Sequence, residues 1–90
     1  MIGVKHAINI QREELKKAHN KKFKIGNYSY RIIYEGGLAE YVSVYGRKDG
    51  GLLYRFIAGF PAYDIHDHKV VIEEAQKIIQ KHQMKISNSY

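Results

Sequence analysis

The stretch from Tyr28 to Phe60 most constrains the fold, because its side chains alternate in character as they do in half-buried β-strands. Turn-forming residues interrupt it at Gly36-Gly37 and at Asp49-Gly50-Gly51. Glycine adopts positive φ without the steric cost of a Cβ atom, so both interruptions favour hairpins. The stretch therefore predicts three antiparallel strands, over residues 28–35, 40–47 and 52–60.

Apolar residues at near-helical spacing precede the predicted sheet and indicate a helix over residues 4–19. A shorter helix that begins at Ile10, with Asn9 as its N-cap, is the alternative. Asn20 and the lysines after it end this helix. Phe23-Lys24-Ile25 then predicts a short edge strand that turns through Gly26-Asn27.

A second helix is predicted over residues 66–83, after Pro61 has stopped the sheet. Either Asp64 or Asp67 can cap its N-terminus, and Glu73 with Lys77 forms a favourable pair one turn apart. Residues 84–90 are expected to be a frayed tail. The apolar stripe of this helix comprises Val71, Ile72, Ala75, Ile78, Ile79 and His82.

These elements predict one α+β domain spanning residues 1–90, an antiparallel β-meander of three to four strands flanked by an N-terminal and a C-terminal helix. The absence of cysteine excludes disulfides and thiolate metal sites, which is typical of a reducing compartment. The N-terminal residues lack the apolar region of a secretion signal, and no apolar run reaches the length of a membrane span. A cytoplasmic location without membrane attachment is therefore expected.

Parity assigns the strand residues to two faces, because neighbours across a hairpin share a face and the loop length decides which residues become neighbours. Loops with an odd number of residues, such as Lys48-Asp49-Gly50, are preferred, since even loops spread polar groups over both faces. The predicted core face then comprises Tyr30, Ile32, Val42, Val44, Tyr54 and Phe56. The predicted outer face comprises Ser29, Arg31, Ile33, Tyr41, Ser43, Tyr45, Arg47, Leu53, Arg55 and Ile57.

The outer face is the leading candidate for a contact surface, because arginine forks onto phosphate oxygens and tyrosine stacks on bases. The formal charge of +6 supports this reading, since most of the excess lysine lies within residues 1–24. Protein interfaces are enriched in the same residue types, so a protein partner is equally compatible. The candidate binding residues are Arg31, Tyr41, Ser43, Tyr45, Arg47 and Arg55 on the sheet, with Lys16, Lys17, Lys21 and Lys22 at the first helix.

Histidines and carboxylates gather at Asp64 and at His66-Asp67-His68, where a metal site would need a further ligand brought in by the fold. The sequence alone supports no metal site and no cofactor. The adjacent pairs Glu13-Glu14 and Glu73-Glu74 point about 100° apart on a helix and are interpreted as solvated faces. With no nucleophile motif or phosphate-binding loop, the chain is expected not to be an enzyme.

The order helix, three strands, helix is similar to that of double-stranded-RNA-binding domains, and three strands followed by a helix resemble the arm-binding domains of integrases, which lay a sheet in the major groove. The likeness lies in element order alone and transfers no function. The leading hypothesis is a small basic protein that binds nucleic acid. The alternative is a small inhibitor of the phage or mobile-element type that binds a host protein, such as a nucleic-acid-processing enzyme. A homodimer that buries the tyrosine-rich face is a third reading.

Overall fold

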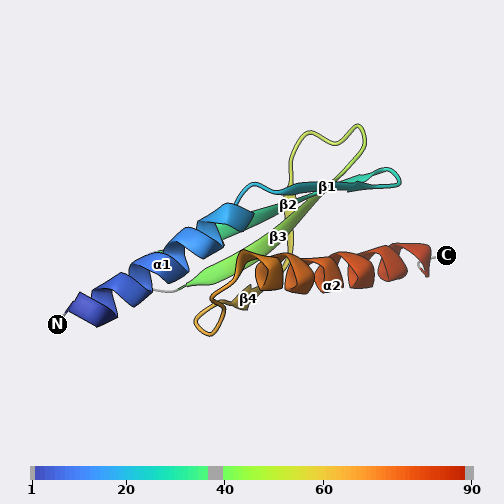
Figure 1. Cartoon of the computed structure of the whole chain (residues 1–90). Coiled ribbons are helices and arrows are strands. Elements are labelled where there is room, and N and C mark those ends of the chain that lie inside the picture. Colours follow the sequence, from blue (N-terminus) through green and yellow to red (C-terminus); the bar gives the residue numbers. More distant parts are fainter. Residues whose placement is uncertain (1, 37–39, 89–90) are drawn as a thin grey trace.

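The computed structural model describes residues 2–36 and 40–88 and shows the predicted α+β meander with four strands. The side chains of residues 2–8 lie outside the description, as does Gly37 of the first hairpin loop. Figure 1 shows two helices beside a single sheet. The elements are α1 (Ile2–Ala18), β1 (Lys22–Ile25), β2 (Tyr28–Glu35), β3 (Tyr41–Lys48), β4 (Arg55–Pro61) and α2 (His68–Ser87).

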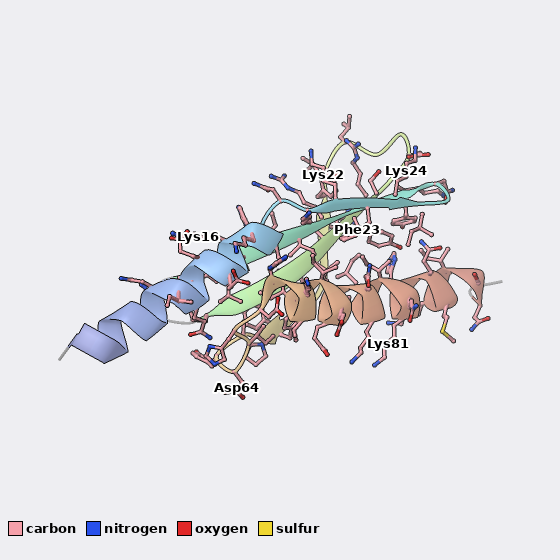
Figure 2. All side chains as sticks on the ribbon, viewed as in Figure 1. Lys16, Lys22, Phe23, Lys24, Asp64 and Lys81 are labelled. Carbon is pink, nitrogen blue, oxygen red and sulfur yellow. The ribbon has the colours of Figure 1, made fainter. Side chains whose placement is uncertain are left out.

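Both helices pack on the same face of the sheet. Helix α1 contacts β2, and α2 contacts β3 and β4, while the two helices also contact each other. Phe23 of β1 points toward α2 in Figure 2, whereas Lys22 and Lys24 point the other way. One core lies between the helices and the sheet, and within residues 2–36 and 40–88 no helix covers the second face of the sheet. Its fully buried members are Leu15, Ala18, Tyr30, Ile32, Val42, Val44, Ala62, Val71, Ala75 and Ile79.

The pairing of β2 with β3 confirms the parity argument for these two strands. Ile32 lies opposite Val44 and Tyr34 lies opposite Val42, so even-numbered positions meet even-numbered positions. The connecting loop, residues 36–40, holds an odd number of residues, as this pairing requires. The apolar side chains of both strands consequently reach the core together.

The third predicted strand is wrong at its start and in the face assigned to most of its residues. Strand β4 begins at Arg55 and not at Leu52, and the loop before it, residues 49–54, holds an even number of residues. Ile57 forms a β-bulge, which adds one unpaired residue to β4. After the bulge Val44 pairs with Ala58, as the expected parity requires, whereas before it Tyr45 pairs with Phe56. Phe56 therefore lies on the outer face, and Ile57 packs against the core in its place.

Gly46 shows why β3 accepts the bulge opposite it. A Cβ atom on Gly46 would lie 2.6 Å from Cδ1 of Ile57 and 3.3 Å from the ring of Tyr30. The missing side chain leaves the space that the bulged isoleucine fills. The predicted core place of Tyr54 is also wrong, because this residue precedes β4 and its ring lies beneath the guanidinium of Arg47.

Helix α1 begins at Ile2, two residues before the predicted start, so the longer predicted helix is confirmed and the alternative start at Ile10 is wrong. It ends at Ala18, just before Asn20 adopts a φ of 68°. A non-glycine residue in the left-handed region stops a helix, and asparagine tolerates that region better than most residues. The prediction that Asn20 ends the helix is confirmed. The short strand β1 and its turn through Gly26, whose φ is 61°, are also confirmed.

Helix α2 begins at His68, and its N-cap is Asp67, whose carboxylate accepts a hydrogen bond of 2.9 Å from the backbone N–H of Lys69. This decides between the two predicted caps. The helix continues to Ser87, so the expected frayed tail from residue 84 is wrong up to that point, and residues 89–90 lie outside the description. Lys77 pairs with Glu74 at 2.9 Å and not with Glu73 as expected.

Two polar networks fasten the helices to the sheet. The hydroxyl of buried Tyr30 lies 2.7 Å from Nδ1 of His82 and accepts a bond of 2.6 Å from the amide of Gln83. Burial and the nearby Lys85 lower the pKa of His82, which keeps its ring neutral as an acceptor for the tyrosine proton. His82, a member of the predicted apolar stripe, is therefore a hydrogen-bonded residue at the boundary of the core.

The second network joins α1 to the start of β3. Arg12 Nε lies 3.0 Å from the buried carboxylate of Glu40, which also accepts a hydrogen bond from the hydroxyl of Tyr34. Burial, followed by this hydrogen bond, raises the pKa of Tyr34 to about 12. The buried carboxylate is thus compensated by one cation and one hydroxyl.

Candidate nucleic-acid interface

A row of cationic and aromatic side chains crosses all four strands on the uncovered face. The pairing places Lys22 beside Arg31, Arg31 beside Tyr45, and Tyr45 beside Phe56. The rings of Tyr45 and Phe56 meet edge to face, with centroids 5.8 Å apart. Lys22 is exposed, and 55% of Phe56 is accessible to solvent. The row therefore offers two cations at one end and an aromatic pair at the other.

A second row lies next to the first, toward the loop that joins β3 and β4. Lys24 pairs with Ser29, and Ser29 pairs with Arg47. The guanidinium of Arg47 lies 5.1 Å from the ring centroid of Tyr54, a cation–π contact that orients it. Lys24 lies 3.5 Å from the carboxylate of Asp49. We call these two rows the basic–aromatic face; its residues are Lys22, Lys24, Ser29, Arg31, Tyr45, Arg47, Tyr54 and Phe56.

Three of the four cations of this face are available for an anionic partner, since Lys24 is paired with Asp49. Across residues 2–36 and 40–88, no carboxylate lies within ion-pair distance of Lys22, Arg31 or Arg47. Arg31 donates through Nε to the side-chain oxygen of Asn20 at 2.9 Å, which fixes the guanidinium but leaves its charge uncompensated. Positive potential therefore persists at this end of the sheet.

Two of the predicted binding residues lie at the opposite end of the same face. Ser43 is buried between Ile33 and Gly59, so its hydroxyl is not a contact group for a partner. Tyr41 lies opposite Glu35 and Pro61, and its ring covers Gly59. Because Glu35 is exposed there, this end is less favourable for phosphates than the basic–aromatic face.

Arg55 does not share the face of Arg31 and Arg47, and the expected arginine triad is wrong in this member. The bulge pairs Arg55 with Gly46, which points into the core. This pairing places Arg55 on the side of the sheet that carries the helices, where it borders a hollow of about 800 Å³ that Tyr28 and His82 also line. A one-residue shift moves a strand residue to the other face, which is what the bulge does here.

The four candidate lysines do not act as one cluster. Lys16 lies 3.6 Å from Glu13, and Lys17 forms an ion pair with Glu14, each within α1. Only Lys21 and Lys22 are exposed beside the sheet and extend the basic–aromatic face toward α1. The helix lysines are thus partly neutralised by their own carboxylates.

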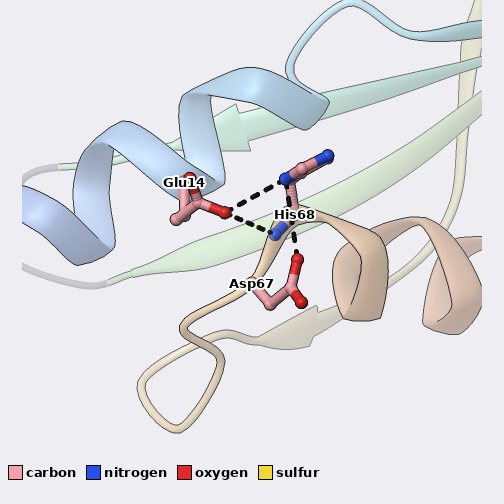
Figure 3. A group of neighbouring side chains, drawn as sticks. All are labelled: Glu14, Asp67 and His68. Atoms are coloured by element: carbon pink, nitrogen blue, oxygen red, sulfur yellow. Dashed lines mark hydrogen bonds and ion pairs between the residues drawn. The ribbon is translucent and has the colours of Figure 1, made fainter.

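The histidine-rich loop places one of its imidazoles between the helices. His68 Nδ1 lies 3.0 Å from Glu14 Oε1 and 3.6 Å from Asp67 Oδ1, as Figure 3 shows, while His66 is exposed. The three ligand atoms lie within 4.8 Å of one another, so this trio could contact a metal ion. All three groups already have partners, however, and the N-terminus of α2 disfavours a cation. We interpret the trio as a link between α1 and α2.

This link corrects the expectation that Glu14 belongs to a solvated face, and it predicts acid sensitivity. The hydrogen bond from Lys17, followed by that from His68, lowers the pKa of Glu14 from 4.5 to about 2. Because the folded pKa is the lower one, the link stabilises the protein fully above pH 4.5 and is lost as the pH falls toward 2.

A Glu14→Gln variant is therefore expected to lose less stability than the wild type across that interval, as measured by urea unfolding at several pH values. Glu13→Gln removes the exposed carboxylate next to it on the same helix and is expected to keep the wild-type slope. Parallel curves for Glu14→Gln and the wild type would contradict the assigned role of Glu14.

Sequence reasoning missed Phe56, Tyr54 and Lys24 as members of the face. Lys24 carried a usable signal, since strict alternation along β1 places it on the same side as Lys22. The sequence held no signal for Phe56 or Tyr54, because the bulge that turns Phe56 outward depends on how Ile57 packs over Gly46.

No protein-family model, curated protein or solved structure matches this chain. Among residues 2–36 and 40–88, neither helix is long and apolar enough to cross a membrane.

Proposed function

We propose that this chain binds nucleic acid through the basic–aromatic face. The observation that carries the proposal is the row from Lys22 through Arg31 and Tyr45 to Phe56, which aligns cations and rings across the uncovered face. Cations attract the phosphate backbone and release its counterions, while aromatic rings accept unpaired bases by stacking. Neither group depends on a particular base, so the expected binding is only weakly selective for sequence.

An unpaired strand fits this face better than a duplex. Neighbouring strands lie about 4.8 Å apart, so the row spans about 14 Å, slightly more than the roughly 12 Å width of the major groove of B-DNA. A four-stranded sheet therefore cannot lie flat in that groove along its full width. The half-exposed ring of Phe56 also needs a base that is free of its own pair.

The test is a titration of labelled single-stranded DNA, single-stranded RNA and duplex DNA by fluorescence anisotropy at two salt concentrations. We expect single strands to bind more tightly than the duplex and affinity to fall as salt rises. The double variant Arg31→Gln/Arg47→Gln is expected to weaken binding by about tenfold or more. It should also reduce the slope of log affinity against log salt concentration by about 1.4. Phe56→Ala should cost about 1–3 kcal/mol of binding free energy.

Lys81→Gln/Lys85→Gln removes the same charge from α2 and is the matched control, which should bind as the wild type does. Equal losses for the two double variants would mean that net charge alone drives the binding. The proposal fails if no probe binds at low salt, or if only the α2 variant loses affinity.

A further inference from the structure

The two edges of the sheet differ in how they are protected. The outer strand β1 carries Lys22 and Lys24, and lysine on an edge strand discourages pairing with other chains. The opposite outer strand β4 has no charged residue after Arg55 and is interrupted only by its bulge and by Pro61 at its end. One side of the short segment from Ala58 to Phe60 pairs with β3, and no strand of the described residues lies beside the other side.

An apolar groove runs along this edge between β4 and α2. Its volume is about 1020 Å³, and a smaller extension of about 410 Å³ shares Gly59, Ile78, Lys81 and Met84 with it. Ile57 and Ala58 line the groove from the strand. Met84, which is 64% exposed, lines the groove from α2.

Lysines one turn apart border the same groove. Lys77, Lys81 and Lys85 follow one another at four-residue spacing and therefore form a stripe on one side of α2. Figure 2 shows Lys81 on the side of α2 that faces away from β1. Lys77 is paired with Glu74, whereas no carboxylate of residues 2–36 and 40–88 lies within ion-pair distance of Lys81 or Lys85.

We propose that the β4–α2 groove binds an extended, acidic and aliphatic segment of another protein, which adds a strand to β4. The backbone of the segment pairs with the open side of residues 58–60, its aliphatic side chains fill the groove, and its carboxylates meet Lys81 and Lys85. This surface shares Phe56 with the basic–aromatic face but none of that face's cations, and it implies a second kind of partner.

Charge decides between such a segment and a second copy of this chain. Two β4 edges paired about a twofold axis would place both α2 helices on the same face of the joined sheet, one on each side of the contact. The uncompensated Lys81 and Lys85 of the two copies would then oppose each other across the interface. An acidic segment reverses that repulsion, and so the acidic partner is favoured.

A labelled peptide of about eight residues that alternates glutamate and valine is the probe, measured by anisotropy and by backbone amide NMR shifts. We expect the glutamate peptide to bind and the largest shifts to fall on residues 55–61. The same peptide with lysine in place of glutamate should not bind. A version with N-methylated backbone nitrogens should bind about tenfold more weakly, because it cannot pair as a strand.

The double variant Lys81→Gln/Lys85→Gln is expected to weaken the peptide about fivefold or more, whereas Arg31→Gln/Arg47→Gln should leave it unchanged. Each double variant is the test in one experiment and the control in the other. The nucleic-acid proposal and the groove proposal can therefore fail independently. Absence of binding, equal binding of the lysine peptide, or shifts confined to β1 and β2 would overturn the groove proposal. Light scattering measures self-association as the protein concentration rises. If the wild type associates and Lys81→Gln/Lys85→Gln associates more strongly, the β4 edge binds a second copy of this chain instead.

Discussion

Replacing Tyr30 with alanine is expected to lower the free energy of unfolding by about 3–5 kcal/mol. Tyr30 is fully buried, stacks on Tyr28 with ring centroids 5.7 Å apart, and meets His82 edge to face at 5.5 Å. Its loss leaves a cavity and removes the hydroxyl that joins β2 to His82 and Gln83 of α2. A domain of this size is stable by about 5–13 kcal/mol, so the variant keeps about 0–10 kcal/mol and is partly unfolded in water only at the low end of that range.

The measurement is urea unfolding followed by circular dichroism, with Tyr45→Ala as the matched control. Tyr45 lies one strand away on the opposite face, is half-buried, and contacts Phe56, so its truncation should cost only about 1–1.5 kcal/mol. Tyr30→Phe keeps the ring and should lose about 1–2 kcal/mol from the hydroxyl alone. Equal destabilisation by the alanine variants of Tyr30 and Tyr45 would contradict the assignment of the two faces.

Replacing Gly59 with alanine is expected to destabilise the protein by about 2–3 kcal/mol. A Cβ atom at this position would lie 2.5 Å from the ring of Tyr41 and 2.7 Å from the backbone oxygen of Val42. The ring can rotate away, but the oxygen belongs to β3, which pairs with β4 at this point, and so the two strands must separate. Thermal unfolding measures this loss.

The double variant Tyr41→Ala/Gly59→Ala separates the two contacts. It removes the ring and leaves the backbone oxygen, so we expect it to recover little of the stability lost in Gly59→Ala. Full recovery would show that the tyrosine ring, and not the close approach of the strands, requires glycine here.

The sequence predicted most of the fold because the determining signals are local. Alternation with glycine-rich breaks defined β2 and β3, and the helical stripe with its aspartate cap defined α2. The position of Asn20 predicted where α1 ends. Each of these signals depends on residues that are close together in the sequence and therefore remain close together in the folded protein.

The candidate site was predicted in part. Arg31, Tyr45 and Arg47 share the expected face because β2 and β3 keep the expected register. Arg55 lies on the opposite face from the one expected, and so does Phe56. The reason is that a single extra residue in β4 reverses the alternation before Ile57. Sequence patterns do not reveal whether a bulge will compensate for a loop with an even number of residues, since the bulge depends on packing across two strands.

Taken alone, the sequence determined the α+β class, the two helices, the meander and the concentration of arginine and tyrosine on it. Only the tertiary structure decided which of those residues act together. The packing of both helices on one face leaves the other face open, and the fit of Ile57 over Gly46 turns Phe56 outward into the row with Lys22, Arg31 and Tyr45. The physical reason is that alternation fixes relative orientation within a strand, whereas contacts between distant residues fix the face that each strand presents.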